Sequence, residues 1–597
     1  MKEALLHGLA IALPFLKAFF VVMFSMNVAV ILTWVDRRQG AMIQDRVGPD
    51  RAVIWLPQRV AQALALLPAL GVACAAVGLA FYDKMQRADS GVGVDAGKAV
   101  VASELAVFVT WFTGIIIAGA VKSRGAQNSF DRFVASLGDP RRLFYGGMIA
   151  HVAILAIVAL TSGQSDVINA VLHGGGVAVL AAAIVGGAVY AVLGMTEPRV
   201  GLRLIGLLHP AADGLKTAFK EDIVPPGVDR FMHGLAPFIS FFPALVVLAV
   251  VPFADTLCTG TTDGWADLSK VLSEVPRAGL CTDGAVRFQV INLNVGILYF
   301  FAVSGTGIVG AALGGWASNN KYSLLGGLRA ASQMVSYEVT LGLTLIGAIM
   351  IYGTLRVDDM VRWQGQNAWG VFVQPLAFFL FFAAAVAESK RIPFDIPEGE
   401  SEVVAGYFTE YAGMKFAMFF FAEYIAVVSS SAVMAAIFFG GWNMPFIFRD
   451  GIDVTIGGQT FFQQALPHGL VILLGFLSFV GKVLMLCWLQ LTIRWTLPRF
   501  RYDQLMKLGW RLLLPASLIN ILVTGLVILV IDDLSYTAMQ GLKLAADLSN
   551  AAVALGGLIA GAAFIRFVLQ PAQHRRVLSS TSAQFAAGGT RRFPMGA

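Results

Sequence analysis

Charge is scarce in this sequence of 597 residues, and long hydrophilic stretches are missing. Only 13% of the residues are Asp, Glu, Lys or Arg, about half of what a soluble domain normally carries. Hydrophobic residues make up 57%, and the mean hydropathy is +0.73. The lack of charge excludes an ordinary soluble protein, and the lack of hydrophilic stretches argues against a separate soluble domain. The sequence therefore predicts an integral membrane protein.

Cysteine is scarce as well, with four residues in the whole chain. Iron-sulfur clusters and structural zinc sites need clustered thiolates, and these four are too few and too scattered. We therefore expect no metal in this chain. Cys74 and Cys487 lie in apolar runs, where core positions are expected. Cys258 and Cys281 share one polar loop and are a disulfide candidate if that loop faces an oxidising compartment.

Apolar runs dominate what remains. A helix needs about 20 apolar residues to cross a bilayer, and about thirteen runs qualify. The first is too long for a signal-peptide core and lacks a basic leader, so we expect it to be retained. The predicted fold class is an all-α integral membrane protein, a bundle of about 13 transmembrane helices. The runs are 10 to 34, 60 to 82, 99 to 121, 143 to 162, 176 to 195, 236 to 254, 289 to 314, 332 to 353, 371 to 388, 413 to 440, 469 to 493, 511 to 532 and 549 to 569.

The Lys and Arg residues predict the orientation of these runs. Bases are enriched in cytoplasmic loops, and most of them fall on the side of the loop that follows the first run. The stretch 163 to 175 has none, whereas 494 to 511 has five. The N-terminus is then outside and the C-terminus cytoplasmic. The loop with Cys258 and Cys281 is outside.

One stretch departs from the general lack of charge. "ESKRIPFDIPEGESEVVAGYFTEY", residues 388 to 411, holds six acids and two bases. Asp395 is a candidate helix N-cap, with Glu398 closing a capping box. That interpretation leaves Glu400 and Glu402 unexplained. Clustered carboxylates raise one another's pKa and can exchange protons near neutral pH, so the stretch predicts a protonatable funnel at the cytoplasmic membrane surface.

Ionisable residues also occur within or at the ends of the apolar runs. A charge at the bilayer centre costs roughly 2.5 to 3.5 kcal/mol on insertion scales, so such residues usually face a polar interior. Glu338, Glu388 and Glu423 are therefore candidates for a proton or substrate path. Lys482 is open to a second interpretation, in which it is locally paired or reaches the membrane surface.

Two further polar stretches flank the membrane. Residues 33 to 51, "TWVDRRQGAMIQDRVGPDR", follow the first run and fit a basic anchor at the membrane surface. Residues 209 to 226 predict a short amphipathic helix on the membrane, in which Asp213 and Lys216 are spaced to pair. Spacing alone names no substrate for either stretch.

Together these segments resemble a known family, the membrane subunit that forms the quinone tunnel of respiratory complex I, NADH:quinone oxidoreductase. This subunit is called H in bacteria and subunit 1 in mitochondria. The acid-rich stretch with its continuation "AGMKFAMFFFAEY" is similar to the longest family signature. "ADGLKTAFKEDIVP", "LNVGILYFFAVSGTGIVGAALGGWASNNKYSLLGGLRAASQMVSYEV" and "LPRFRYDQLMKLGW" also match, in family order. The resemblance covers residues 10 to 51 and about 199 to 525.

The resemblance implies a division of the chain into four parts. Residues 1–51 form the first transmembrane helix and a quinone-tunnel loop, and residues 199–532 form the core quinone-tunnel domain. Residues 52–198 are an inserted four-helix membrane region, expected to face lipid or bind an accessory subunit. Residues 533–597 add a C-terminal helix and a basic tail.

The resemblance also implies roles for individual residues. The residues that line or support the quinone tunnel are Arg37, Arg38, Asp213, Lys216, Arg391 and Arg501. The residues of the proton path are Glu338, Glu388, Glu398, Glu400, Glu402 and Glu423. The chain departs from the family at Asp36, where Glu is usual, at Asp50, where Asn is usual, and before Arg494, where a Trp is usual.

The function implied is the quinone-tunnel membrane subunit of a proton-pumping NADH:quinone oxidoreductase, not catalytic alone. The chain itself then binds no cofactor. Quinone is the substrate, FMN and iron-sulfur clusters belong to partner subunits, and the partners are the peripheral-arm and neighbouring membrane-arm subunits, without nucleic acid. The expected location is a bacterial inner membrane. Two alternatives stay open: the membrane anchor of a related hydrogenase or formate-linked complex, and a stand-alone secondary transporter, although the internal repeats common in transporters are not evident.

Overall fold

The structure is a computed structural model in which part of the chain is described. The described residues are 2–44, 48–49, 54–57, 199–202, 208–258, 285–397, 406–449, 451–457, 459–466, 468–533 and 536–569. The chain divides into two compact units. One comprises Met1–Pro49 with His209–Ala560, and the other comprises Asp50–Leu208 with Gly561–Ala597.

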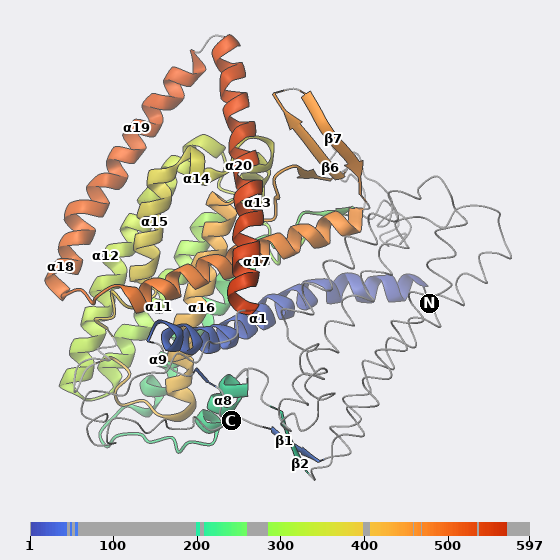
Figure 1. Cartoon of the computed structure of the whole chain (residues 1–597). Coiled ribbons are helices and arrows are strands. Elements are labelled where there is room, and N and C mark those ends of the chain that lie inside the picture. The colour runs from blue at the N-terminus through green and yellow to red at the C-terminus, as the bar shows by residue number, and fades with distance from the viewer. Residues whose placement is uncertain are drawn as a thin grey trace, which may run out of the picture. The chain divides into compact units, whose positions relative to one another are not determined.

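Helices dominate the described residues (Figure 1). They are α1 (Lys2–Ile43), α8 (Leu208–Ala218), α9 (Arg230–Val246), α11 (Gly296–Ala317), α12 (Lys321–Tyr352), α13 (Val357–Gln366), α14 (Gly370–Val373), α15 (Pro375–Glu388), α16 (Gly413–Phe438), α17 (His468–Thr496), α18 (Tyr502–Lys507), α19 (Leu514–Asp532) and α20 (Tyr536–Leu569). The 3₁₀ helix η2 (Val247–Val250) continues α9, and the π-helical stretch η3 (Leu508–Leu513) joins α18 to α19.

Seven helical segments among the described residues are long and apolar enough to cross a membrane. They are Leu13–Ile43, Arg230–Val250, Gly296–Ala317, Lys321–Tyr352, Gly413–Phe438, His468–Thr496 and Tyr502–Ile531. This confirms a helical membrane protein. The full number of about 13 spans and the orientation stay predictions. The runs 60 to 82, 99 to 121, 143 to 162 and 176 to 195 lie outside the described residues.

The predicted run 371 to 388 is interrupted in the structure. It divides into the short helix α14 and the helix α15, which begins at Pro375. Proline lacks an N–H and suits the first turn of a helix better than its interior, so it marks a new start. Gln364 of α13 fixes this junction, because its amide donates to the carbonyl of Ala436 and accepts from the N–H groups of Gly370 and Gly440.

Helix α16 is the centre of the bundle. Nearly every side chain from Ala422 to Phe438 is buried, and the helix packs on α1, α9, α15 and α17. A helix that is apolar on all sides is expected in such an interior position. Its alanines and serines allow neighbouring helices to approach closely.

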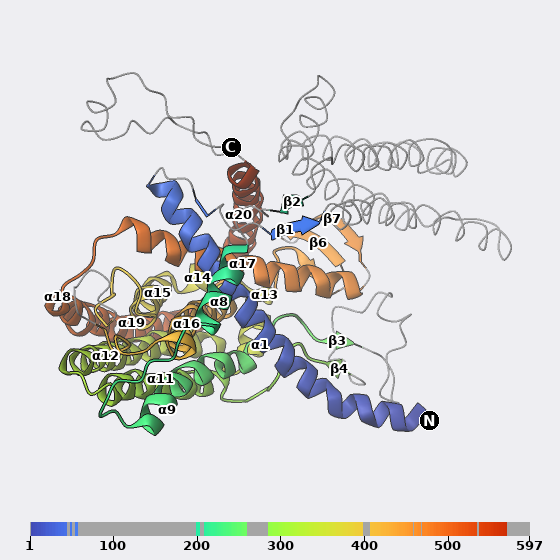
Figure 2. The same cartoon turned by 90° about the horizontal axis from the view of Figure 1, so that it is seen from below.

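Glycines set the close packing of α11 with its neighbours. A Cβ at Gly310 would overlap the backbone of Ser240 in α9, and a Cβ at Gly315 would overlap Gly327 of α12. These positions therefore need glycine. In Figures 1 and 2, α12 lies among α11, α15 and α19, all of which it contacts.

Three small sheets qualify the all-α prediction. In the unit with Asp50–Leu208, β1 (Ile54–Pro57) pairs antiparallel with β2 (Arg199–Leu202). In the other unit, β3 (Leu257–Cys258) pairs with β4 (Ala285–Val286). There too, β5 (Ile447–Phe448), β6 (Gly451–Ile456) and β7 (Gln459–Ala465) form one antiparallel sheet, called here the β5–β7 hairpin. Short strands in loops between apolar runs do not change the fold class.

Candidate functional site

The first part of the acid-rich stretch is held firmly between helices. Gln333 of α12 donates hydrogen bonds to the carbonyls of Ala387 and Phe394, at 2.7 and 2.9 Å. The N–H of Phe500 donates to the carbonyl of Pro393 at 3.0 Å, and the rings of Phe394 and Phe500 stack. The end of α15 and the residues that follow it therefore have a defined position against α12.

Glu423 lies on α16, deep in the bundle and only 3% exposed. Its Oε1 accepts a hydrogen bond from the hydroxyl of Tyr407 at 3.0 Å, and that hydroxyl accepts from Lys390 Nζ at 3.1 Å. Its Oε2 lies 3.6 Å from Arg391 Nη2. A buried carboxylate needs such partners, because an isolated charge is very costly to bury.

A second buried ion pair adjoins the first. Asp36 of α1 forms an ion pair with Arg494 of α17, and Trp495 Nε1 donates to its other oxygen at 2.8 Å. The hydroxyl of Tyr424 donates to Asp36 at 2.9 Å, while the guanidinium of Arg391 lies 4.0 Å from the centre of the Tyr424 ring. Tyr424 thus connects the Asp36 pair to the cation beside Glu423.

A cavity of about 70 Å³ adjoins Glu423. Glu388, Lys390 and Glu423 line it, together with buried serines such as Ser240 and Ser429. The Ser240 hydroxyl is buried and makes no hydrogen bond within the described residues. A volume of about 70 Å³ accommodates roughly two water molecules at the liquid volume of about 30 Å³ each. The cavity can therefore hold a short water chain between two carboxylates.

Glu338 extends the acidic group on α12. Its carboxylate packs against Gly305 of α11, where a Cβ would overlap Oε1. Ser304 and Gly307, on either side of Gly305 in α11, line the same cavity as Glu388 and Glu423. The structure thus gathers Glu338, Glu388 and Glu423 in one region of the bundle.

The residues assigned to the quinone tunnel differ in their exposure to solvent and in their partners. Arg37 Nη2 lies 2.6 Å from Asp213 Oδ2, and both side chains are about half exposed. Asp213 therefore pairs with Arg37 of α1 rather than with Lys216, which is exposed. Arg38 lies over the ring of Trp34.

Arg501 and Arg391, the other two tunnel candidates, lie in opposite environments. Arg501 is exposed at the start of α18, where its backbone N–H donates to Gln504. Arg391 is buried next to Glu423 and joins the acid group.

Several predicted residues belong to parts of the chain that the structure does not describe. Glu398, Glu400 and Glu402 lie outside the described residues, as does Cys281. The backbone of Cys258 pairs with Ala285 in β3 and β4, but the disulfide prediction itself lies outside the described residues. The capping box of Asp395 and Glu398 is likewise outside, although Asp395 is only 2% exposed.

Lys482 is paired locally, which agrees with the second interpretation given for it from the sequence. Its Nζ donates to the carbonyls of Gly441 and Asn443 at 2.8 and 2.6 Å, and it lies 4.3 Å from the centre of the Trp369 ring. It caps the chain just after α16, away from the acid group.

Sequence reasoning missed the residues that connect the acids. Tyr407, Tyr424 and Trp495 are aromatic residues among many, and nothing in their spacing marks them. Asp36 and Arg494 carried a usable signal, because each directly follows a predicted span on the same predicted face of the membrane. Opposite charges in such positions are candidates for an ion pair.

Comparison with known proteins gives consistent matches. A family model described as NADH dehydrogenase matches residues 169–525. The chain is 41% identical over 324 residues to the NADH-quinone oxidoreductase H subunit 1 of Cytophaga hutchinsonii, which covers 54% of this chain and 84% of that protein. It is 43% identical over 323 residues to the H subunit 2 of Geobacter metallireducens, covering 54% and 83%. It is 40% identical over 340 residues to the H subunit of Bacillus thuringiensis, covering 56% and 86%.

Proposed function

The chain belongs to the NADH dehydrogenase family, together with the H subunits of bacterial NADH-quinone oxidoreductases, and from this membership we propose that it couples quinone reduction to proton translocation. In this role it is a multi-pass subunit of the bacterial inner membrane and is not catalytic alone. FMN and iron-sulfur clusters in partner subunits deliver the electrons. Quinone takes up two electrons and two protons to become quinol.

The observation that carries the proposal is the setting of Glu423. Its carboxylate is buried and accepts a hydrogen bond from Tyr407, whose hydroxyl accepts one from Lys390. On its other side the carboxylate lies next to Arg391. It also faces the cavity of about 70 Å³ that Glu388 lines. Low effective dielectric strengthens each of these interactions. A change of charge at the quinone therefore alters the electrostatic field at Glu423, and water in the cavity provides a route for a proton toward Glu388.

The proposal also assigns roles to residues of the quinone tunnel and to the start of the proton path. Arg37 and Asp213 join α1 to α8 by an ion pair that stays partly exposed. We assign Arg37, Arg38, Asp213, Lys216, Arg391 and Arg501 to the wall or support of the quinone path. We assign Glu398, Glu400 and Glu402 to the start of the proton path.

The experiment replaces Glu423 with Gln in the complete complex. Gln keeps the size of the side chain but removes the titrating group. We expect quinone-dependent NADH oxidation to fall by at least about tenfold, which corresponds to about 1.4 kcal/mol in the barrier. NADH oxidation with an artificial acceptor at the peripheral arm should be unchanged, which shows that the peripheral arm is intact.

The matched control is Glu410→Gln. Glu410 is a partly exposed acid that accepts a hydrogen bond from Asn320 and does not line the cavity. We expect it to leave quinone reduction within about twofold of the wild type, as for a surface substitution. Normal quinone reduction and normal proton translocation in Glu423→Gln would contradict the proposal.

A further inference from the structure

His233 is a buried histidine that the proposed function does not use. It lies in the first turn of α9, and its side chain has no contact with solvent. Within the described residues, neither ring nitrogen makes a hydrogen bond of ordinary geometry. The backbone carbonyl of Glu410 lies beside the ring without completing such a bond. Burying a polar group without a full partner is costly, so the position of this histidine needs an explanation.

The contact that His233 makes is a stack on Tyr411. The two rings are nearly parallel, with an angle of 6° between their planes and 4.1 Å between their centres. The hydroxyl of Tyr411 donates to the carbonyl of Gly314 in α11 at 3.3 Å. Tyr411 is therefore held between α9 and α11, and His233 supplies the contact from α9.

Tyr411 belongs to residues 406–412, called here the tyrosine segment, which also carries Tyr407. The hydroxyl of Tyr407 donates to Glu423. The rings of Tyr407 and Tyr411 both pack edge-on against the ring of Phe419 in α16, at 5.1 and 5.0 Å between centres. Because the two tyrosines share this partner and lie four residues apart, a displacement of Tyr411 also displaces Tyr407.

The charged groups that face His233 come from three parts of the chain. Lys415 belongs to α16, Asp222 follows α8, and Glu410 lies in the tyrosine segment. Lys415 Nζ lies 2.9 Å from Asp222 Oδ2, and Glu410 accepts a hydrogen bond from Asn320 at 2.7 Å. Both acids thus already have partners, while burial and the charge of Lys415 oppose a second cation. The stack therefore suits a neutral imidazole.

We propose that His233 is a positioning residue for the proton path. Its neutral ring, stacked on Tyr411, keeps the tyrosine segment closed and Tyr407 within reach of Glu423. When His233 takes up a proton, the buried cation destabilises the closed segment, because the open segment exposes the imidazolium to water. The activity of the subunit then falls as the pH falls. This inference rests on the proposed function of Glu423 and adds control of that site by pH.

Hydrogen exchange of the tyrosine segment tests the closure directly. The complete complex in nanodiscs is exchanged between about pH 7.5 and about pH 5.5, the range in which histidine acquires its charge. We expect the protection of residues 406–412, corrected for intrinsic rates, to fall by at least about threefold at the acid end. One proton limits the change to about tenfold per pH unit.

The variant His233→Phe keeps an aromatic ring for the stack but cannot take up a proton. Its protection should therefore be the same across the whole pH range. Constant protection in the wild type, or an equal loss in His233→Phe, would overturn the proposal.

The pH profile of quinone-dependent NADH oxidation tests the effect on activity. The activity of His233→Phe is divided by that of the wild type at each pH, so that the acid responses of other groups cancel. We expect a ratio near one at about pH 7.5 and of at least about three at about pH 5.5. A ratio that does not change with pH would show that His233 only fills space. The control is His209→Phe, a partly exposed histidine of α8, which should follow the wild-type profile.

The two measurements separate this inference from the proposed function. Hydrogen exchange reports the tyrosine segment itself and does not depend on proton transfer by Glu423. If Glu423→Gln reduces quinone normally while the wild type loses protection at acid pH, the proposed proton path fails and the closure by His233 stands. If protection is constant, the closure by His233 fails whatever the outcome for Glu423→Gln.

Discussion

At the scale of single residues, the buried acids of this bundle are stabilised by cations that come from distant parts of the chain. Glu423 meets Arg391, and Asp36 meets Arg494. Tyr424 contacts both groups, since its hydroxyl bonds Asp36 and its ring lies under Arg391. Because the two pairs share Tyr424, a change in one alters the electrostatic field of the other.

The first prediction concerns Asp36, which stands where the family usually has Glu. Asp36 has three partners, Tyr424, Arg494 and Trp495. Asp36→Asn removes the carboxylate that pairs with the buried Arg494, and removing one partner of a buried ion pair costs about 3 to 5 kcal/mol. We expect a large loss of assembled complex, measured on native gels of solubilised membranes.

The control for Asp36 is Asp503→Asn. Asp503 is exposed and its nearest cation, Lys507 Nζ, is 3.8 Å away, so we expect a change of at most about 0.5 kcal/mol. An assembled amount of Asp36→Asn equal to that of this control would show that the Asp36 pair does not hold α1 to α17.

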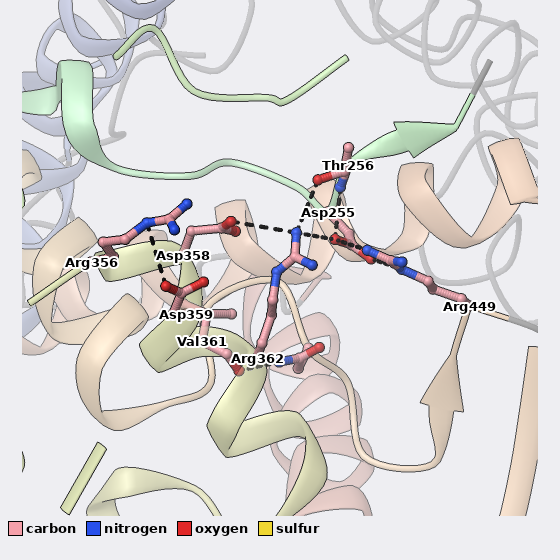
Figure 3. Close-up of polar contacts among 9 residues, drawn as sticks. Asp255, Thr256, Arg356, Asp358, Asp359, Val361, Arg362 and Arg449 are labelled. Carbon is pink, nitrogen blue, oxygen red and sulfur yellow. Dashed lines mark hydrogen bonds and ion pairs between the residues drawn. The ribbon is translucent and has the colours of Figure 1, made fainter. Parts of the chain in front are cut away.

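At the scale of elements, the β5–β7 hairpin is anchored by charges with opposite pH responses (Figure 3). Burial raises the pKa of Asp255, but the hydrogen bonds and charge of Arg449 and the charge of Arg362 outweigh it, so the pKa lies below its ordinary value. Burial raises the pKa of Asp358, and Arg362 only partly offsets it. The two acids therefore affect stability in opposite directions.

The second prediction follows from these signs. The contribution of Asp255 is fully present above the ordinary Asp pKa of about 3.9 and is lost as the pH falls through its lower folded value. Protonation of Asp358 stabilises the fold as the pH falls through its raised value. Protection of residues 446–466 from hydrogen exchange, corrected for intrinsic rates, should thus pass through a maximum near the ordinary Asp pKa of about 3.9.

Asp255→Asn gives a sharper version of this test. It should remove the loss of protection at low pH and lower the opening free energy of the hairpin by about 3 kcal/mol at neutral pH. Asp359→Asn is the control, because Asp359 forms only a partly exposed pair with Arg356 at 3.3 Å. Protection that is the same in Asp255→Asn and in this control would contradict the anchoring role.

The elements also show what the sequence can predict. Hydrophobic length located all seven of the described candidate spans, because burial in lipid requires it. It misplaced their ends, since α1 continues through polar residues to Ile43 and α12 begins at Lys321. It missed the β5–β7 hairpin, although "VTIGGQTFF" carries a Gly-Gly turn signal between β-branched and aromatic residues.

The site was less predictable than the spans. The cost of burying charge singled out Glu338, Glu388 and Glu423, which the structure gathers in one region. Their partners depend on which helices cross and at what height. Asp36 and Arg494 are 458 residues apart in the chain, so only the packed bundle brings them together.

At the scale of the whole molecule, the inserted region begins and ends at adjacent points. β1 and β2 pair antiparallel, and Pro57 is opposite Arg199. The inserted region therefore starts and finishes at the same end of the two-stranded sheet formed by β1 and β2. This supports the proposal that residues 52–198 are a module added to the family core, with an even number of spans that leaves the later orientation unchanged.

The last prediction removes that module. Excising residues 58–198 and joining Pro57 to Arg199 through Asn-Gly replaces the insertion with a two-residue turn, the shortest loop that an antiparallel ladder commonly takes. We expect the complex to assemble and to reduce quinone within about twofold of wild type, because no residue of the acid group is removed. The control excises residues 58–170, which removes three predicted spans instead of four. An odd number inverts every later helix, so the control should fail to assemble, since cytoplasmic charges would have to cross the membrane. If the longer excision fails as completely as the control on native gels, the insertion is part of the core and the modular division is wrong.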